Sequence, residues 1–461
     1  MLVVGGGPAG LTAALTLGRR GADVTLVEAA PELGGMAGSR TIGGLRVDLG
    51  SHRLHSVASP EVESLLVDLL GDDLQVRLRN GRLRIGGRWV RFPLRSTDLV
   101  RSLPPRFVLS AARDTLLGPV RRRTPIVERS TDDTFAAVVR RGLGPAMLDD
   151  FYGPYAEKLW GRPAEHLAGE LARRRIAASS PGRLLAKVAR AARREPIVFR
   201  YPRLGYGQVV DELVRHCEDA GVEIRVETTA AEVDVGTPGS AVVALSDGSS
   251  LDVDRVLWSA PVGALPAVVR GAAPPGPIVQ LRHRSMVLSY LVFDGEPVSP
   301  FDAHYLPSTE SIATRMSEPR NYRDGPDPNG RTVLCLEVPC DRGDDVWSST
   351  AADLGERLAS DLRSMGLTER SPVAFDVVRL PNVYPVIGPE DVGPLERLLA
   401  WSQSLPGITP FGRQGLFVAD NLHHVMEMGL AAAAAIDDNG GWDEAAWSVS
   451  LADFAMNVVE D

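Results

Sequence analysis

The sequence predicts an α/β fold in which a Rossmann-like domain, built on a parallel sheet, is interleaved with an α+β domain that contains a mixed sheet and a helical subdomain. Three observations support this prediction. A strand, a glycine-rich turn and a helix follow one another in residues 2–20, and strand patterns suited to the same sheet return after residue 250 and after residue 410. The third is length, because 461 residues exceed what one hydrophobic core holds.

The turn after the first strand is typical of dinucleotide binding. Three glycines have the spacing G-x-G-x-x-G, and residues 11–20 are predicted to be helical. Such glycines permit a tight turn, let a pyrophosphate approach the backbone, and let helix and strand pack closely, while the N–H groups at the helix start face the phosphates. The predicted contacts of this turn are Gly5, Gly7, Pro8, Ala9 and Gly10.

The next strand ends in Glu28, and a second glycine pair follows it. A carboxylate at this point accepts hydrogen bonds from ribose hydroxyls. Gly34, Gly35 and Met36 would let the backbone run beside the cofactor beyond its adenosine half. The alternative is a turn of glycines without a ligand.

This arrangement resembles the flavoprotein superfamily of amine oxidases, protoporphyrinogen oxidases, phytoene desaturases and UDP-galactopyranose mutases. The resemblance implies FAD, held by a domain of the glutathione reductase-2 type. It also implies that the backbone at Ala230 faces the adenine. Residues 415–421 are predicted to be a strand that ends in an acid, followed by a helix that starts at Gly429. In the superfamily this element closes over the FAD, which makes Asp420, Met428 and Gly429 candidate FAD contacts; Asp420 as a helix N-cap is the alternative.

Two segments resemble the UDP-galactopyranose mutase-like branch. Residues 47–55 resemble a Gly-Pro-His-x-Phe-His segment beside the flavin, which implies FAD contacts at Gly50, Ser51 and His52. Residues 151–161 resemble a Tyr-x-x-Lys-x-Trp-Gly segment at the substrate cavity. Ser51 replaces the proline of the mutases, Phe417 stands where a tyrosine is expected, and an asparagine-rich segment is missing. We therefore expect a relative of the mutases with a different substrate.

The candidate catalytic residues come from the same comparison. His52 could orient substrate or shuttle a proton. Arg413 could hold an anionic group or favour reduced flavin, and an ordinary ion pair is its alternative. One helical face would carry three further residues, although a packed aromatic face explains two of them equally well. These three are Tyr155, Lys158 and Trp160, and Tyr384 is expected to line the cavity.

Composition and charge narrow the function. Hydrophobic residues make up 44% and charged residues 24%, no run of eighteen apolar residues occurs, and the net charge of −9 gives no sign of nucleic-acid binding. We interpret the apolar first residues as a strand, with no signal peptide. The cysteines Cys217, Cys335 and Cys340 lack metal-ligand spacing and favour a reducing compartment, so we expect a cytoplasmic protein without a metal site.

Basic residues concentrate in residues 101–203, where 21 Lys and Arg face 10 Asp and Glu, a net charge of +11. Arg121–Arg123, Arg173–Arg175 and Arg193–Arg194 form the clusters. They indicate a solvated helical face, a site for an anionic small molecule, or contact with an anionic membrane surface.

The expected domain division follows from these segments. Residues 1–80, 200–265 and 380–461 would form a discontinuous FAD-binding domain, residues 81–199 a helical, basic substrate or cap region, and residues 266–379 the sheet of the substrate domain. Residues 82–93 show a short strand pattern within the second of these regions.

We expect an FAD-dependent oxidoreductase that oxidises a small-molecule biosynthetic intermediate, anionic or sugar-linked in character, by hydride transfer to FAD. No cysteine or histidine stands at a recognised flavin attachment motif, which favours non-covalent FAD. Two alternatives stay open. One is a redox-neutral enzyme in which reduced flavin acts on a nucleotide sugar. The other is a non-catalytic binding protein resembling the Rab GDP-dissociation inhibitors.

Overall fold

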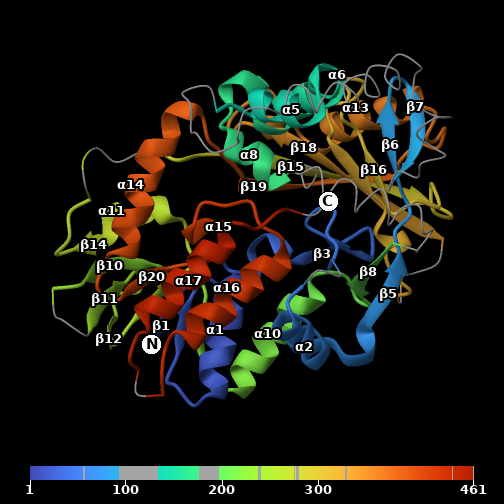
Figure 1. The fold of residues 1–461 in the computed structure, drawn as a ribbon. Helices are drawn as coiled ribbons and strands as arrows, with labels where there is room; N and C mark the ends of the chain where they lie inside the picture. Colours follow the sequence, from blue (N-terminus) through green and yellow to red (C-terminus); the bar gives the residue numbers. More distant parts are fainter. Residues whose placement is uncertain are drawn as a thin grey trace.

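The computed structural model describes residues 1–55, 58–92, 133–175, 197–236, 240–274, 276, 280–325, 327, 330–438 and 440–459. Figure 1 shows two sheet-based parts, one around the N-terminal strand and one around the long strands of the middle of the chain, with a group of helices above the second. None of the helices described is long and apolar enough to cross a lipid bilayer.

The first part is built on a five-stranded sheet in which every pairing is parallel. In spatial order its strands are β20 (Ile408–Pro410), β13 (Val256–Trp258), β1 (Leu2–Val4), β2 (Thr25–Val27) and β9 (Glu223–Arg225). All but β9 are buried along their whole length, as expected for a parallel sheet that is covered on both faces. The predicted Rossmann-like α/β fold is confirmed.

Helix α1 (Pro8–Arg19) follows β1 and packs against α16 (Leu422–Ala434) and α10 (Gln208–Asp219) (Figure 1). A Cβ at Gly429 would lie 2.6 Å from the carbonyl oxygen of Ala9, so α16 approaches α1 this closely only because residue 429 lacks a side chain. The first and last parts of the sequence thus share one core.

The C-terminal element differs from its prediction. The strand is Ile408–Pro410, whereas the segment expected to be extended, residues 415–421, follows a short helix, α15 (Gly412–Gly415). Positive φ angles at Gly412 (73°) and Phe417 (55°) interrupt any extended run. Helix α16 begins at Leu422, so Gly429 lies within the helix and the predicted helix start was wrong.

The second part is a seven-stranded mixed sheet. In spatial order its strands are β19 (Ala374–Val386), β15 (Arg282–Asp294), β18 (Arg331–Cys340), β17 (Arg315–Ser317), β16 (Ala303–Tyr305), β6 (Gly81–Ile85) and β7 (Arg88–Phe92). Alternate side chains of β15 point to opposite faces. Val287 and Leu291 pack under α13 (Ala351–Ser364), whereas Leu288 and Tyr290 pack toward the hairpin of β3 (Ser39–Ile42) and β4 (Leu45–Asp48).

Two expected domain boundaries cut this sheet. Strands β6 and β7 confirm the strand pattern expected at residues 82–93, and β6 pairs in parallel with β16, so part of the region 81–199 belongs to this sheet. Strand β19 runs across the boundary at residue 380, because its antiparallel pairing with β15 continues to Val386. The rest of the division stays a prediction.

Smaller elements complete the fold. A four-stranded sheet contains β12 (Ser250–Val253), β11 (Ala241–Leu245), β10 (Ala230–Asp234) and β14 (Val269–Arg270). Two further antiparallel pairs are the hairpin of β3 with β4 and the pair of β5 (Leu74–Leu78) with β8 (Val198–Pro202), whose strands are far apart in sequence. The remaining α-helices are α2 (Pro60–Leu70), α5 (Phe135–Leu143), α6 (Pro145–Met147), α7 (Gly153–Trp160), α8 (Gly169–Arg175), α11 (Leu265–Val268), α12 (Asp345–Ser348), α14 (Val392–Gln403) and α17 (Glu444–Phe454). The basic clusters 121–123 and 193–194 lie outside the described residues.

Replacement of Gly429 by Ala tests the contact between α1 and α16. In a helix, Gly→Ala ordinarily stabilises by about 1 kcal/mol. Here the new Cβ meets backbone, so we expect the free energy of unfolding to fall by about 1–3 kcal/mol, measured by urea denaturation. Gly393→Ala in α14 is the matched control, because its Cβ would meet only the end of Arg397 at 3.6 Å, and it should not destabilise. Equal effects of the two changes would contradict the proposed close contact.

Candidate functional site

A cavity of about 280 Å³ lies between the carboxyl end of the parallel sheet and one face of the seven-stranded sheet. One wall is formed by the glycine turn at residues 7–9, the loop at residues 35–37 and the segment 49–53. The opposite wall is formed by side chains of β15, β17, β18 and β19, and residues 413–425 close one end. Ligands of open α/β sheets bind at this edge, which makes the cavity the candidate site.

The three glycines of the turn have different roles. Gly5 has a φ of 108°, and a Cβ there would lie 2.5 Å from Ser259 Oγ. A Cβ on Gly10 would lie 2.0 Å from the carbonyl oxygen of Gly5, so helix and turn pack backbone to backbone. A Cβ on Gly7, in contrast, would meet no atom of the described part of the chain within 4 Å. Gly7 is the N-cap of α1, and its open side faces the cavity.

Glu28 and the second glycine pair hold the glycine turn in place through hydrogen bonds to its backbone. The Glu28 carboxylate accepts hydrogen bonds from Gly6 N (2.7 Å) and Ala30 N (2.9 Å). Gly34 N donates to the Gly6 carbonyl at 2.8 Å, and a Cβ on Gly35 would have Gly7 Cα as its nearest neighbour, at 3.9 Å. The two glycine segments therefore lie side by side, with Gly35 and Met36 on the cavity wall and Glu28 outside it.

The residues present fit a dinucleotide with a pyrophosphate. The N-terminus of α1 opens on the cavity, and its first turn holds no acidic side chain. The two lining carboxylates, Glu337 and Asp420, are both paired with arginines. Arg413 adds a cation whose hydrogen bonds go to carbonyl groups. The space and the charge at the turn both suit an anionic ligand.

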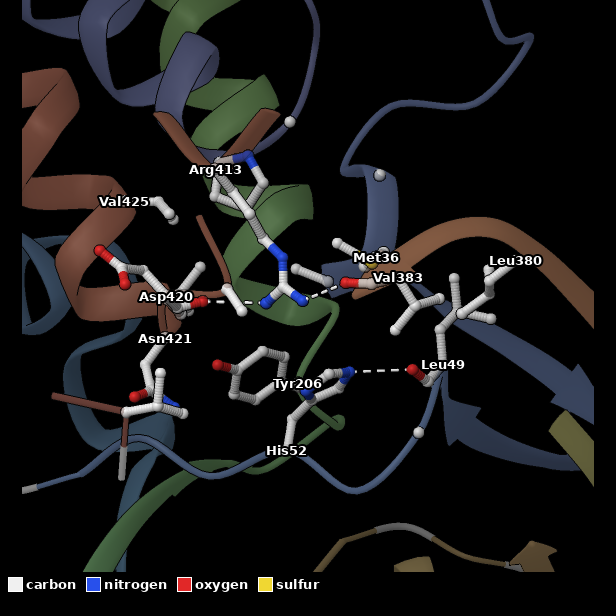
Figure 2. A pocket seen from close by; sticks show the side chains of 18 of the residues that line it. Met36, Leu49, His52, Tyr206, Leu380, Val383, Arg413, Asp420, Asn421 and Val425 are labelled. Carbon is white, nitrogen blue, oxygen red and sulfur yellow. Dashed lines mark hydrogen bonds between the residues drawn. The ribbon is translucent and has the colours of Figure 1, made fainter. Parts of the chain in front are cut away.

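His52 lies on the cavity wall, stacked on Tyr206 with ring centroids 4.7 Å apart, and Figure 2 shows the pair below Arg413. Its Nε2 lies 2.9 Å from the Leu49 carbonyl oxygen. Because a carbonyl can only accept, Nε2 carries the proton and Nδ1 is left as an acceptor. Burial lowers the pKa of His52 below its ordinary value, opposed by the nearby charges of Asp48 and Glu337, so the neutral form dominates at neutral pH.

Arg413 lies at the closed end of the cavity. Nη1 donates to the Asp420 carbonyl at 3.0 Å, Nη2 donates to the Val383 carbonyl, and buried Nε has no hydrogen-bond partner among the described residues (Figure 2). Its guanidinium lies 5.9 Å from the Tyr384 ring, and the guanidinium of Arg175 lies 4.9 Å from the same ring. The ordinary ion pair weighed from the sequence is not formed, because no carboxylate oxygen contacts the Arg413 guanidinium in the described part of the chain.

Asp420 is buried in the cavity wall, and both of its carboxylate oxygens accept hydrogen bonds. Its Oδ1 accepts from Arg174 Nη1 at 3.1 Å, and its Oδ2 accepts from Asn457 Nδ2 at 2.9 Å. The N-cap of α16 is the next residue, Asn421, so the capping role considered for Asp420 was wrong. The cluster Arg173–Arg175 is only partly a solvated face: Arg173 pairs with Asp133 with 41% of its side chain exposed, whereas Arg175 lies over aromatic rings on the cavity wall.

Several predicted site residues do not line the cavity. Lys158 donates to the carbonyls of Leu306 (2.6 Å) and Ser308 (2.9 Å) in the loop after β16, and Trp160 donates to the Pro385 carbonyl in β19 at 3.1 Å, so both hold α7 against the second part of the fold. Tyr155 stacks on Phe151 in the same helical part. The other predicted residues outside the lining are Gly5, Gly10, Glu28, Gly34, Ala230, Met428 and Gly429. Met428 is buried in the core next to α1, and Ala230 lies in the four-stranded sheet.

Sequence reasoning missed the pair Arg315–Glu337 on the cavity wall formed by β15, β17, β18 and β19, which we call the cavity floor. The two residues lie opposite each other on β17 and β18, and no local pattern marks them. It also missed Met286, Leu288 and Leu380, which supply an apolar stretch of the same floor. Their strands could be recognised from the sequence, but the face they present depends on register across distant strands.

Comparison with known proteins gives a consistent result. The family model described as flavin containing amine oxidoreductase matches residues 8–436. A coproporphyrinogen III oxidase of Propionibacterium freudenreichii subsp. freudenreichii is 26% identical over 403 residues, with 74% of this chain and 73% of that protein covered.

Two solved structures share the fold. A reduced UDP-galactopyranose mutase matches with a TM-score of 0.78 at 20% identity, covering 97% of this chain and 98% of its own. The cyclohexylamine oxidase of Brevibacterium oxydans IH-35A matches with a TM-score of 0.67 at 14% identity, covering 94% and 97%. At these identities the likeness shows the fold alone.

Lys158→Met tests the structural role of Lys158. Burial lowers the pKa of this amine to about 7, whereas the unfolded chain keeps the ordinary value near 10.5. Between these values the unfolded state binds more protons, so the folded wild-type protein gains stability as the pH rises through that window. We expect the unfolding free energy of wild type, relative to Lys158→Met, to rise by about 1 kcal/mol per pH unit between pH 7 and 10. A difference that stays constant with pH would contradict this role.

Proposed function

This chain belongs to the flavin containing amine oxidoreductase family, and from that premise we propose that it is an FAD-dependent oxidoreductase that oxidises a small anionic substrate in the cavity described above. The observation that carries the proposal is the open side of Gly7. The N-terminus of α1 is presented to the cavity, and no atom of the described residues lies within 4 Å of a Cβ built on its N-cap, Gly7. A pyrophosphate at that point would be bound by backbone N–H groups and by the helix dipole.

Different residues of the chain would contact different parts of the cofactor along the cavity. Gly7, Pro8 and Ala9 would hold the pyrophosphate, and Glu28 would keep the turn in shape and accept from the ribose. Gly35 and Met36 would lie along the cofactor, with Gly50 and Ser51 beside its ring. When bound, the flavin supplies the acceptor for a hydride. His52 Nδ1, an acceptor, would orient a substrate donor or take up its proton.

Arg413 supports an anionic substrate. A buried guanidinium without a carboxylate partner is costly unless an anion completes its surroundings. Tyr384 and the guanidinium of Arg175 lie beside it, so an anionic group of a ligand would be met by two cations and a hydroxyl. The apolar floor of Met286, Leu288 and Leu380 would then cover the body of the substrate.

The same cation favours a second candidate function. A nucleotide sugar also carries a pyrophosphate, and a redox-neutral reaction of such a substrate with reduced flavin would use the same arginines. The Ser51 and Phe417 replacements weigh against it. Because the Propionibacterium relative is named a coproporphyrinogen III oxidase, coproporphyrinogen III is a first substrate to test, beside primary amines and nucleotide sugars.

Replacement of Gly7 by Val tests the cofactor site. Since its φ of −76° suits any residue and its Cβ would meet none of the residues that the structure describes, the variant should fold with wild-type stability. We expect its affinity for FAD, measured by titration of the apoprotein, to fall about 100-fold or more, because the new side chain fills the phosphate space. Thermal melts without FAD serve as the control. Unchanged FAD binding, or a wild-type chain that is colourless and takes up no FAD, would overturn the proposal.

Anaerobic mixing with the candidate substrates separates the two functions. Loss of the oxidised flavin absorbance on mixing is expected for the oxidoreductase, because the hydride stays on the flavin when no oxygen is present. Turnover only after reduction with dithionite would instead establish the redox-neutral reaction. Heat-released cofactor, identified as FAD by mass spectrometry, would confirm that the attachment is non-covalent.

A further inference from the structure

The pair formed by Glu337 and Arg315 connects the substrate sheet to the segment that carries His52. Arg315 Nε and Nη2 donate to the two carboxylate oxygens of Glu337, each at 2.9 Å, in a bidentate pair. The Glu337 side chain is only 4% exposed, and it lines the cavity. Its Oε1 also accepts a hydrogen bond from Ser51 N, at 2.6 Å, across the boundary between the two sheets.

This hydrogen bond holds a tight turn. Gly50 has a φ of 108°, and a Cβ there would lie 3.4 Å from Glu337 Oε1 and 3.6 Å from His52 Nε2. Leu49 is fixed at the other end, since its N–H donates to Gly38 and its carbonyl accepts from His52. The backbone on both sides of Gly50 is therefore anchored, and the imidazole lies stacked on Tyr206 at the cavity wall.

We propose that Glu337 is a positioning residue for His52, which it holds at the cavity through Ser51 N–H, and that Arg315 balances its charge so that the imidazole stays neutral. The inference deepens the proposed function, on which it rests for the identity of the site. The geometry does not depend on a substrate, so it can be tested before one is known.

The charges around His52 predict the direction in which its pKa changes when a neighbouring charge is removed. Burial, the largest effect, lowers its pKa, and so does the charge of Arg315, whereas Asp48 and Glu337 raise it. The stacked Tyr206 is neutral, because burial raises its pKa. Removing the charge of Glu337 or of Arg315 should therefore move the titration of His52 in opposite directions, which a merely structural pair would not do.

Three variants make the test. Glu337→Gln keeps an oxygen for Ser51 N–H and removes the charge; Arg315→Gln leaves the carboxylate unbalanced; Glu337→Ala removes the acceptor as well. The titration of His52 is followed by NMR in full-length protein loaded with FAD and labelled at its eight histidines. The His52 signal is assigned by its loss in His52→Gln.

We expect His52 to titrate about one pH unit higher in Arg315→Gln than in wild type, and no higher than wild type in Glu337→Gln. In Glu337→Ala the turn is released, and His52 should titrate nearer the ordinary value of a histidine in water. Glu318→Gln is the matched control. Glu318 is also buried and accepts from backbone N–H groups of Val298 and Ser299, but it does not line the cavity, so the His52 titration should not change.

The proposal would be overturned if His52 titrated at the same pH in Glu337→Gln and in Arg315→Gln. So would a Glu337→Ala protein that titrates like Glu337→Gln. The same measurement on protein without FAD separates this result from the proposed function, because failure to bind FAD would leave the order of the two glutamine variants unchanged.

Discussion

The backbone contact between the glycine turn and its neighbours is the constraint on which the rest of the structure depends. At Gly10 the helix meets the turn with no side chain between them, and at Gly429 helix α16 meets α1 in the same way. These two contacts hold α1 in one position between β1 and α16, and that position aims its N-terminus into the cavity. The distances across the site, from Gly7 to the floor of the substrate sheet, follow from it.

The walls of the cavity come from parts of the chain that are far apart. The turn and the His52 segment are N-terminal, the floor lies in β15, β17, β18 and β19, and the closed end is formed by residues 413–425. Polar groups link these parts directly: Glu337 to Ser51, Arg413 to Val383, and Asp420 to Arg174 and Asn457. Buried and hydrogen-bonded, such links fix relative positions more than they add stability. The site is therefore rigid where the two sheets face each other.

The sequence predicted what is encoded locally. The strand, glycine turn, helix and acid of the first 28 residues carry their own chemistry, and the structure places Gly7, Pro8, Ala9, Gly35, Met36, Gly50, Ser51, His52, Tyr384, Arg413 and Asp420 on one cavity. The errors arose where tertiary contacts decide. Residues 408–410 are too short to show a strand period, and Gly429 looks like a helix start unless its packing on Ala9 is known. Lys158 and Trp160 fit a substrate motif, but their hydrogen bonds go to backbone carbonyls of the loop after β16 and of β19. Arg315 and Glu337 could not be predicted, because the register of two strands brings them together.

The order of strands in the parallel sheet has a consequence for synthesis in the cell. Strand β1 is flanked by β2 and β13, and β20 joins only at residues 408–410, with α16 later still. While the ribosome is still translating, the N-terminal turn has neither its neighbouring strand at 256–258 nor the helix that packs on it. Parallel pairing over such separations is slow to form. The surroundings of the glycine turn are therefore complete only after residues 408–434 have been synthesised, more than 400 residues after β1.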